Sequence, residues 1–248
     1  MKLGGAYLIN LVVVYNRVDK CCAKRIHHAE VYAGKKKCGV IIYVPGVDMY
    51  AIACNGAKAS SVSVKHKGPQ YLQLAEVQVF GGLKAVKGIN LLSYGQPTKQ
   101  SSNWKGSKHG TAVDGNFNGY WSGRKIAISA VRGTAAKPQT WQVDLGSLVP
   151  VYLVLVHLRQ DACCTKRAEG TEVYAGSKLC GTVRVVKNVY VYPINCGGVK
   201  ARIIKVQNKA DYLSLTEVQV YGVGKPKRTA KAKKAAGTKP SYGKLNQF

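Results

Sequence analysis

Acidic residues are scarce in this sequence. Its 248 residues include 11 Asp and Glu against 38 Lys and Arg, which gives a formal net charge of +27 at neutral pH. An excess of one sign affects solubility and the choice of partners, and it does not specify a fold. The candidate partners are polyanionic surfaces: sulfated or sialylated glycans, nucleic acid, an anionic mineral or membrane surface, or an acidic protein.

Long hydrophobic runs are also absent. The longest apolar stretches lie near residues 11–15 and 148–156 and are shorter than the roughly 18 residues that cross a bilayer, so we expect no membrane insertion. The opening MKLGGAYLINLVVVY is similar to a signal peptide. It aligns, however, with LGSLVPVYLVLVHLRQD later in the chain. We therefore expect a strand there, and we expect any true signal to lie outside this sequence.

The motifs of common enzymes are missing. The sequence contains no G-x-S-x-G, no H-E-x-x-H, no phosphate-binding loop and no pair of carboxylates in a shared apolar setting. The cysteines all have partners in a repeat, which argues against a cysteine nucleophile. These observations predict a protein that is not an enzyme.

Eight cysteines are present, and they reveal an internal repeat. Each of the four in the first half recurs 142 positions later: 21, 22, 38 and 54 match 163, 164, 180 and 196. The surrounding text repeats as well, with RVDKCCAKR matching RQDACCTKR and LAEVQVFG matching LTEVQVYG. Self-similarity of this kind indicates two copies of one structural module.

An even cysteine count at fixed spacing predicts a disulfide framework and hence an extracellular, secreted protein. We expect Cys38 to pair with Cys54 and Cys180 with Cys196, and we expect the adjacent pairs Cys21–Cys22 and Cys163–Cys164 to form vicinal bridges. Zinc is the competing interpretation, because His27 and His28 follow the first pair. The second copy has Glu169 and Gly170 there, and no C-x-x-C pair occurs, so zinc is weakly supported.

Short segments rich in Val, Ile and Tyr alternate with clusters of Gly, Asn, Asp and Lys. Examples are TWQVDLG, VYLVLVHLR, GTVRVV, ARIIKVQ and LTEVQVYG. This pattern predicts an all-β, antiparallel sandwich. In the last segment the alternation places Thr216 on the solvent side and Val218 and Val220 toward the core.

The two copies differ in extent. The second has about 75 residues before its WQVDLG strand, whereas the first begins almost at that strand. We therefore expect the C-terminal half of a module at 1–83, a complete module at 84–222 and a basic flexible tail at 223–248. Without the tail the remaining residues still carry about +19.

The motifs together resemble the F-type lectin family, the fucolectins. The resemblance rests on R-x-D followed by a Cys-Cys pair and Lys or Arg, on AVDGNFNG and WQVDLG upstream, and on the closing LTEVQVYG. It implies a jelly-roll sandwich of galactose-binding type, a structural calcium ion, and a shallow fucose site on the loops at one end.

The resemblance also implies which residues form the sugar site. In the complete module these are Arg132, Arg159, Asp161, Cys163, Cys164, Lys166 and Arg167, and in the half module Arg17, Asp19, Cys21, Cys22, Lys24 and Arg25. Lys166 and Arg167 are alternatives for one basic position. Arg132 stands where the family has a His. Because Arg has no acceptor and a fixed charge, Arg132 either binds a sulfate or carboxylate or is a plain surface charge.

The calcium loop implied by the resemblance is better preserved. Thr111 and Asn116 would offer carbonyl oxygens, Asp114 and Glu217 carboxylates, and Ser129 its hydroxyl and carbonyl. Oxygen donors of this kind suit calcium. For Asp114 an Asx turn in the sequence DGN is the alternative interpretation.

Three hypotheses for the function follow. The first is a secreted lectin-like protein that binds fucosylated or anionic glycans or extracellular matrix. The second is a self-assembling structural protein of an extracellular fibre, coat or adhesive that keeps the lectin fold without sugar binding. A half module exposes strands and an apolar face that must pack on the other module, on another chain or on a missing segment, and we expect self-association through it. The third, nucleic-acid binding by the tail, is disfavoured by the disulfide framework.

Overall fold

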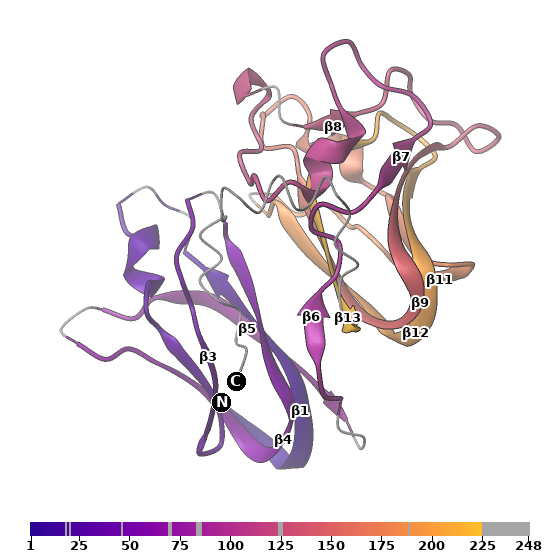
Figure 1. Cartoon of the computed structure of the whole chain (residues 1–248). Coiled ribbons are helices and arrows are strands. Elements are labelled where there is room, and N and C mark those ends of the chain that lie inside the picture. The colour runs from indigo at the N-terminus through magenta and orange to yellow at the C-terminus, as the bar shows by residue number, and fades with distance from the viewer. Residues whose placement is uncertain are drawn as a thin grey trace. The chain divides into compact units, whose positions relative to one another are not determined.

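The computed structural model describes residues 1–17, 19, 21–45, 47–68, 71–82, 86–123, 126–187 and 189–224 (Figure 1). Within them the chain divides into two compact units, which we call the first unit (residues 1–89) and the second unit (residues 90–224). The predicted tail from position 225 onward, and residues 83–85 at the predicted module boundary, lie outside the described residues. No helix in the described ranges is long and apolar enough to cross a membrane.

The first unit contains one five-stranded antiparallel sheet in the order β3-β2-β4-β1-β5. Its elements are β1 (Lys2–Asn16), 3-10 helix η1 (Ala23–Ile26), β2 (Glu30–Ala33), β3 (Lys36–Val40), β4 (Met49–Lys65) and β5 (Leu74–Gly82). Strand β1 covers the segment that is similar to a signal peptide, so the strand predicted there is confirmed.

The second unit is built on an eight-stranded sheet with the path β11-β10-β12-β9-β13-β6, to which β7 adds on β9 and β8 on β13. Its strands are β6 (Ile89–Leu91), which begins at the junction of the units, β7 (Thr98–Gln100), β8 (Ala127–Ile128), β9 (Gln139–Leu158), β10 (Glu172–Ala175), β11 (Lys178–Thr182), β12 (Val191–Asn208) and β13 (Ser214–Val223). Its 3-10 helices are η2 (His109–Val113), η3 (Trp121–Gly123) and η4 (Thr165–Ala168). The predicted all-β, antiparallel sandwich is confirmed.

Two strands are longer than the sequence predicts because glycines let them bend. TWQVDLG and VYLVLVHLR form the single strand β9, which contains Gly146 at φ 78°. Strand β12 contains Gly197 and Gly198 at φ 63° and 85°, where its pairing with β9 shifts register. Glycine tolerates this left-handed backbone without strain. The long strands therefore continue around the sandwich instead of ending at its edge.

Each unit has its own core of alternating apolar side chains. In the second unit Trp141, Val143 and Leu145 of β9 are buried, and the Trp141 Nε1–H donates to the carbonyl oxygen of His109 at 2.9 Å. This bond fixes η2, and with it the loop that contains Asp114. In the first unit, Val12 and Val14 of β1 are likewise buried in the core.

Two details of the strand prediction are wrong. Thr216 is 1% exposed rather than solvent-facing, because β13 is covered on both faces, and its hydroxyl donates to the Leu158 carbonyl at 2.8 Å. The segment GTVRVV stays in strand β11 only through Thr182 and then turns away.

All eight cysteines are paired as predicted. Cys38–Cys54 joins β3 to β4, and Cys180–Cys196 joins β11 to β12 at the matching place. Cys21–Cys22 and Cys163–Cys164 are vicinal bridges. Because no free cysteine remains, the alternative of thiolate ligands to zinc at Cys21 and Cys22 is excluded.

Candidate functional site

A cavity of about 330 Å³ lies in the second unit, beside the segment that follows strand β9. Its walls come from the loop between β7 and η2, from helix η3, from strand β8, from residues 159–167 and from Tyr212 before β13. The lining residues are Trp104, Trp121, Ile128, Arg159, Cys163, Cys164, Arg167 and Tyr212. Four of the predicted sugar-site residues therefore line one cavity.

Asp161 holds Arg159 in place. The Arg159 Nε–H donates to Asp161 Oδ2 at 2.5 Å, and the same oxygen accepts the Trp121 backbone N–H at 3.0 Å. Partial burial alone would raise the pKa of the Asp161 carboxyl, but the hydrogen bonds from Arg159 and from the Trp121 amide outweigh burial and lower that pKa. The Arg159 side chain is 13% exposed, so its guanidinium is fixed in the cavity wall.

Aromatic rings face both arginines of the cavity. The Arg159 guanidinium lies 5.7 Å from the centre of the Trp121 ring, and that of Arg167 lies 5.0 Å from the centre of the Tyr212 ring. Trp104 meets Tyr212 edge to face, with ring centres 6.3 Å apart. Contacts of this kind orient a guanidinium plane, and they leave large apolar ring surfaces at the same site.

The vicinal disulfide forms a third kind of surface in the cavity. Cys163 is exposed, whereas Cys164 is 3% exposed and donates its backbone N–H to the Asp161 carbonyl at 2.9 Å. The Thr165 hydroxyl donates to the carbonyl oxygens of Arg159 and Asp161. The turn from Arg159 to Thr165 is therefore held by its own hydrogen bonds. It places the apolar Cys163–Cys164 sulfurs next to the Arg159 guanidinium.

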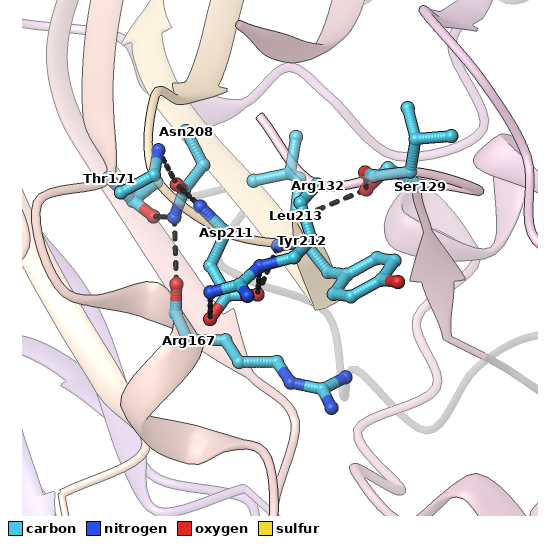
Figure 2. Close-up of polar contacts among 10 residues, drawn as sticks. Ser129, Arg132, Arg167, Thr171, Asn208, Asp211, Tyr212 and Leu213 are labelled. Atoms are coloured by element: carbon cyan, nitrogen blue, oxygen red, sulfur yellow. Dashed lines mark hydrogen bonds and ion pairs between the residues drawn. The ribbon is translucent and has the colours of Figure 1, made fainter. Parts of the chain in front are cut away.

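Three predicted residues do not line the cavity: Asp161, which holds Arg159 in place, Lys166 and Arg132. Lys166 is exposed, so Arg167 is the basic residue at the alternative position that faces the cavity. The Arg132 side chain is 64% exposed and pairs with Asp211, with Nε–Oδ1 at 3.3 Å (Figure 2). Asp211 directly precedes Tyr212, so Arg132 lies near the cavity rim with an acid already beside it.

Four residues of the cavity were not predicted: Trp104, Trp121, Ile128 and Tyr212. A signal for two of them exists in the sequence, because all three Trp residues fall in the segment that the first copy lacks. Tyr212 has a signal in the repeat itself, since YLSLTEVQV matches YLQLAEVQV. Ile128 is an ordinary strand residue, and nothing in the sequence distinguishes it.

Comparisons with known proteins agree with this architecture. Residues 111–206 match the family described as NedA-like, galactose-binding domain. The crystal structure of a fucolectin from striped bass (Morone saxatilis) serum superposes with a TM-score of 0.51 and 23% identity, over 90% of this chain and 80% of that one. This is an F-type lectin-like fold.

Further solved structures are similar over about half of the chain. A fucose-binding module of Streptococcus pneumoniae is 29% identical over 56% of this chain and 99% of its own, with a TM-score of 0.47. The lectin domain of lectinolysin, solved with Lewis B antigen, is 24% identical over 53% of this chain and 95% of its own, also with a TM-score of 0.47. No curated protein sequence matches this chain.

The first unit of the F-type lectin-like chain repeats one wall of the cavity. Arg17 forms an ion pair with Asp19, as Arg159 does with Asp161. The Arg25 guanidinium lies 5.6 Å from the centre of the Tyr71 ring and donates to Gln73 Oε1 at 3.2 Å. Lys24 stays on the exposed side of η1. The opposite wall, which Trp104 and Trp121 form in the second unit, has no counterpart in the first copy of the sequence.

Two of the five predicted calcium ligands, Asp114 and Glu217, are close enough for their charges to interact. Glu217 on β13 is 1% exposed, and its Oε2 accepts the Gly115 backbone N–H at 3.3 Å. Burial, and after it the charge of Asp114, raises the pKa of Glu217 well above its ordinary value. A buried carboxylate beside a second carboxylate is unfavourable unless a cation balances the two charges.

The other three predicted ligands have contacts within the protein. The Thr111 hydroxyl donates to the Lys108 carbonyl at 2.6 Å, and Asn116 Oδ1 accepts the Asn118 backbone N–H at 2.9 Å. Asp114 Oδ1 accepts the Asn116 backbone N–H at 2.8 Å, so the alternative Asx turn is formed as well. The Ser129 hydroxyl accepts the Leu213 N–H at 3.0 Å and donates to the Val131 carbonyl at 2.9 Å, which ties β8 to the start of β13 (Figure 2).

Proposed function

We propose that this is a secreted, non-enzymatic, F-type-lectin-like protein whose second unit binds a glycan in the cavity. One observation carries the proposal: a single cavity combines the vicinal disulfide, an arginine fixed by Asp161, a second arginine, and three aromatic rings. Ligand sites typically pair apolar walls with a few well-placed polar groups, and this cavity has that composition.

The chemistry of the cavity suits a sugar ring. Guanidinium N–H groups of Arg159 and Arg167 can donate to neighbouring hydroxyl oxygens in one plane. The rings of Trp104 and Trp121 and the Cys163–Cys164 sulfurs offer apolar surface to the C–H face of the same sugar. Because both polar groups are permanent cations, fucosylated glycans that also carry sulfate or carboxylate are the favoured ligands.

Calcium is part of this proposal. Its carboxylate ligands would be Asp114 and Glu217, with carbonyl oxygens of Thr111 and Asn116 completing a set of hard donors. The electrostatic interaction of the two carboxylates supports this assignment, whereas the Ser129 hydroxyl is used in two other hydrogen bonds. When bound, the ion would fix the loop between η2 and η3, which leads directly into Trp121 of the cavity.

The test is retention on immobilised fucosylated and sulfated glycans in the presence of calcium. One portion is eluted with free fucose at high salt and another with a salt gradient. Elution by fucose supports a lectin site, whereas release by salt alone means that charge attraction explains the binding. Arg159→Ala should abolish fucose-sensitive retention, because it removes the fixed donor.

A matched control removes the same charge elsewhere. Arg202 pairs with Asp144 on the surface and does not line the cavity, so Arg202→Ala should retain fucose-sensitive binding. Equal loss in both variants would contradict the assignment of Arg159 to the site.

A second candidate function is self-assembly into an extracellular structural material. The supporting observation is the contrast between β13 and β5, which have nearly the same sequence. Residues 214–222 of β13 are buried, whereas Ala75 and Glu76 of β5 are exposed and Val77, Val79 and Phe80 are only half-buried. Strand β5 also ends the path of its sheet. Sedimentation velocity over a range of protein concentrations tests this candidate, because a purely monomeric protein would contradict it.

A further inference from the structure

The loops of the first unit contain a histidine cluster that the second unit lacks. His27 and His28 follow η1, and their rings stack with centres 3.8 Å apart. His66, after β4, lies with Nε2 2.9 Å from the His27 carbonyl oxygen. The corresponding positions of the second copy of the repeat hold Glu169, Gly170 and Asn208.

Three contacts bring segments 24–28 and 66–73 together. Besides the contact between His66 and His27, Arg25 donates to Gln73 and its guanidinium lies over Tyr71, which is 74% exposed. We call the surface formed by Lys24, Arg25, His27, His28, His66, Lys67 and Tyr71 the histidine face. It is separate from the cavity of the second unit.

The histidine face has an unusual charge balance. No acidic residue occurs between positions 20 and 29 or between 49 and 75. The equivalent segments of the second unit contain two acids, Glu169 and Asp211, each paired with an arginine. Lys67 pairs with Glu30 on β2 at 3.3 Å, whereas no ion pair to Lys24 or Arg25 is found within the described ranges. Asp19 interacts electrostatically with Arg25 but forms its ion pair with Arg17. The face therefore has more cations than anions.

His28 stands where the backbone favours glycine. Its φ is 68°, and Gly170 at the repeat position has φ 72°. Around Gly170 nothing lies within 4 Å of the place of a Cβ atom, so a side chain meets open space and only the backbone is strained. A non-glycine residue held in this region is a reason to look for a function of its side chain.

The hydrogen bonds distinguish the three rings. His27 Nδ1 accepts the Tyr43 backbone N–H at 3.0 Å, which requires an unprotonated Nδ1, and burial together with the charges of His28 and His66 lowers the pKa of His27. His66 is held by the His27 carbonyl. The ring of His28 is exposed and makes no hydrogen bond within the described residues. It is therefore the ring best placed to meet a ligand.

We propose that the histidine face binds sulfate groups of an anionic glycan, and that it binds them more tightly when the His28 imidazole carries a proton. Arg25, fixed by Gln73 and Tyr71, supplies a permanent cation and planar donors, and a protonated imidazole beside it would add a second charge. Because the anion favours the protonated ring, affinity rises as the pH falls.

The test measures the affinity of the full chain for a heparin oligosaccharide at pH 5.5 and pH 7.5. We expect a dissociation constant about threefold or more lower at pH 5.5, since uptake of part of one proton accompanies binding. His28→Gly copies the second unit and relieves the backbone strain, so it should fold, and it should reduce the ratio of the two constants to about one. An unchanged ratio in His28→Gly would overturn the proposal.

Titratable groups elsewhere in the chain need matched controls. Burial raises the pKa of Asp48 in the first unit to about 6, so Asp48→Asn should leave the ratio unchanged. His109→Gln, in the second unit, should leave it unchanged too. Arg25→Gln should weaken binding at both pH values. If either control removes the pH effect and His28→Gly does not, the site is not the histidine face.

The choice of ligand and the independence from the sugar cavity are tested in parallel. Desulfated heparin should bind much more weakly and without the pH effect, and equal binding would overturn the assignment to sulfate. Tighter binding to double-stranded DNA than to heparin at equal salt would likewise overturn a glycan ligand. Arg159→Ala should preserve the pH effect, so this proposal and the proposed sugar site can fail separately.

Discussion

At the scale of single residues, Asp161 supports the candidate sugar site without lining it. Its carboxylate accepts hydrogen bonds both from Arg159 and from the amide that begins η3, so it links two walls of the cavity. A carboxylate that accepts two bonds orients both donors more firmly than a neutral amide can. The position of Arg159 therefore depends on a residue that touches no ligand.

Asp161→Asn should lower glycan affinity about tenfold, because the charge-assisted bond to Arg159 contributes roughly 1.5–3 kcal/mol and only part of it is lost. The thermal midpoint should change little. Glycan titration and a melting curve of the same sample measure both. Asp144→Asn, which loosens the surface pair with Arg202, is the control and should keep full affinity. A large fall in the midpoint with unchanged affinity would mean a structural role alone.

Asp48 gives a pH dependence of stability in the first unit. Burial raises its pKa to about 6, above the ordinary value near 3.9 of an unfolded chain. The folded state then holds this proton more tightly, so stability falls as the pH rises from about 4 to about 6 and stays lower above that range.

Asp48→Asn should therefore stabilise the first unit at pH 7.5 by about 1 kcal/mol, allowing for its partial exposure, and should change little at pH 4. Denaturant unfolding followed by amide hydrogen exchange in β1 and β4 measures the effect. An equal gain at both pH values would contradict a titration of Asp48.

At the scale of elements, the two kinds of disulfide have different tasks. Cys180–Cys196 joins residues 16 apart on β11 and β12, whereas Cys163–Cys164 joins neighbours and closes almost no loop. A disulfide stabilises mainly by restricting the unfolded chain, and this restriction grows with the loop that it closes.

Replacing both Cys180 and Cys196 by Ser should cost about 3 kcal/mol of unfolding free energy and leave glycan affinity nearly unchanged. Replacing both Cys163 and Cys164 by Ser should do the reverse, with little loss of stability and a clear loss of affinity. Melting curves measure the loss of stability, and glycan titrations measure the loss of affinity, in the two double variants. Similar behaviour of the two would contradict this division.

The elements also show how far the sequence alone predicts this structure. The repeat predicts every disulfide, the all-β class and strand β1, because each residue pattern occurs twice in the same order. It does not predict that β9 and β12 continue through Gly146 and Gly197, since glycine in a strand pattern also marks a turn. The alternation of polar and apolar residues places Thr216 wrongly on the solvent side, because it cannot reveal a strand that is covered on both faces.

The candidate site was predictable where one short segment supplies it. Arg159, Asp161 and the Cys163–Cys164 pair are close in sequence, so their motif was visible. Trp104 and Tyr212 come from distant loops, and only the fold brings them to the same cavity. The resemblance assigns Arg132 to the site by its position in the sequence alone. Its pairing with Asp211 depends on a loop far along the chain, which the sequence does not reveal.

At the scale of the whole molecule, calcium should stabilise the second unit selectively. The charges of Asp114 and Glu217 interact there, whereas the first copy has Glu76 at the position of Glu217 and no segment equivalent to residues 111–116. A ligand that binds only the folded state at a concentration of 100 times its dissociation constant adds about 2.7 kcal/mol.

Calorimetry with millimolar calcium and with a chelator should show one transition that moves upward with calcium and one that does not. Asp114→Asn should abolish the shift, because it removes an exposed carboxylate ligand without emptying the core. Asp211→Asn, an acid of the same unit outside the loop, should keep the shift. A shift that persists in Asp114→Asn would place the ion elsewhere.

The distribution of tryptophan makes the two units optically distinguishable. Trp104, Trp121 and Trp141 all lie in the second unit, two of them in the cavity wall and one in the core. The sequence of the first unit contains tyrosine but no tryptophan. Intrinsic emission excited at long wavelength therefore comes from the second unit alone. A glycan in the cavity should quench or shift this tryptophan emission. A sulfated chain on the histidine face should leave the tryptophan emission unchanged and affect only the emission of tyrosine.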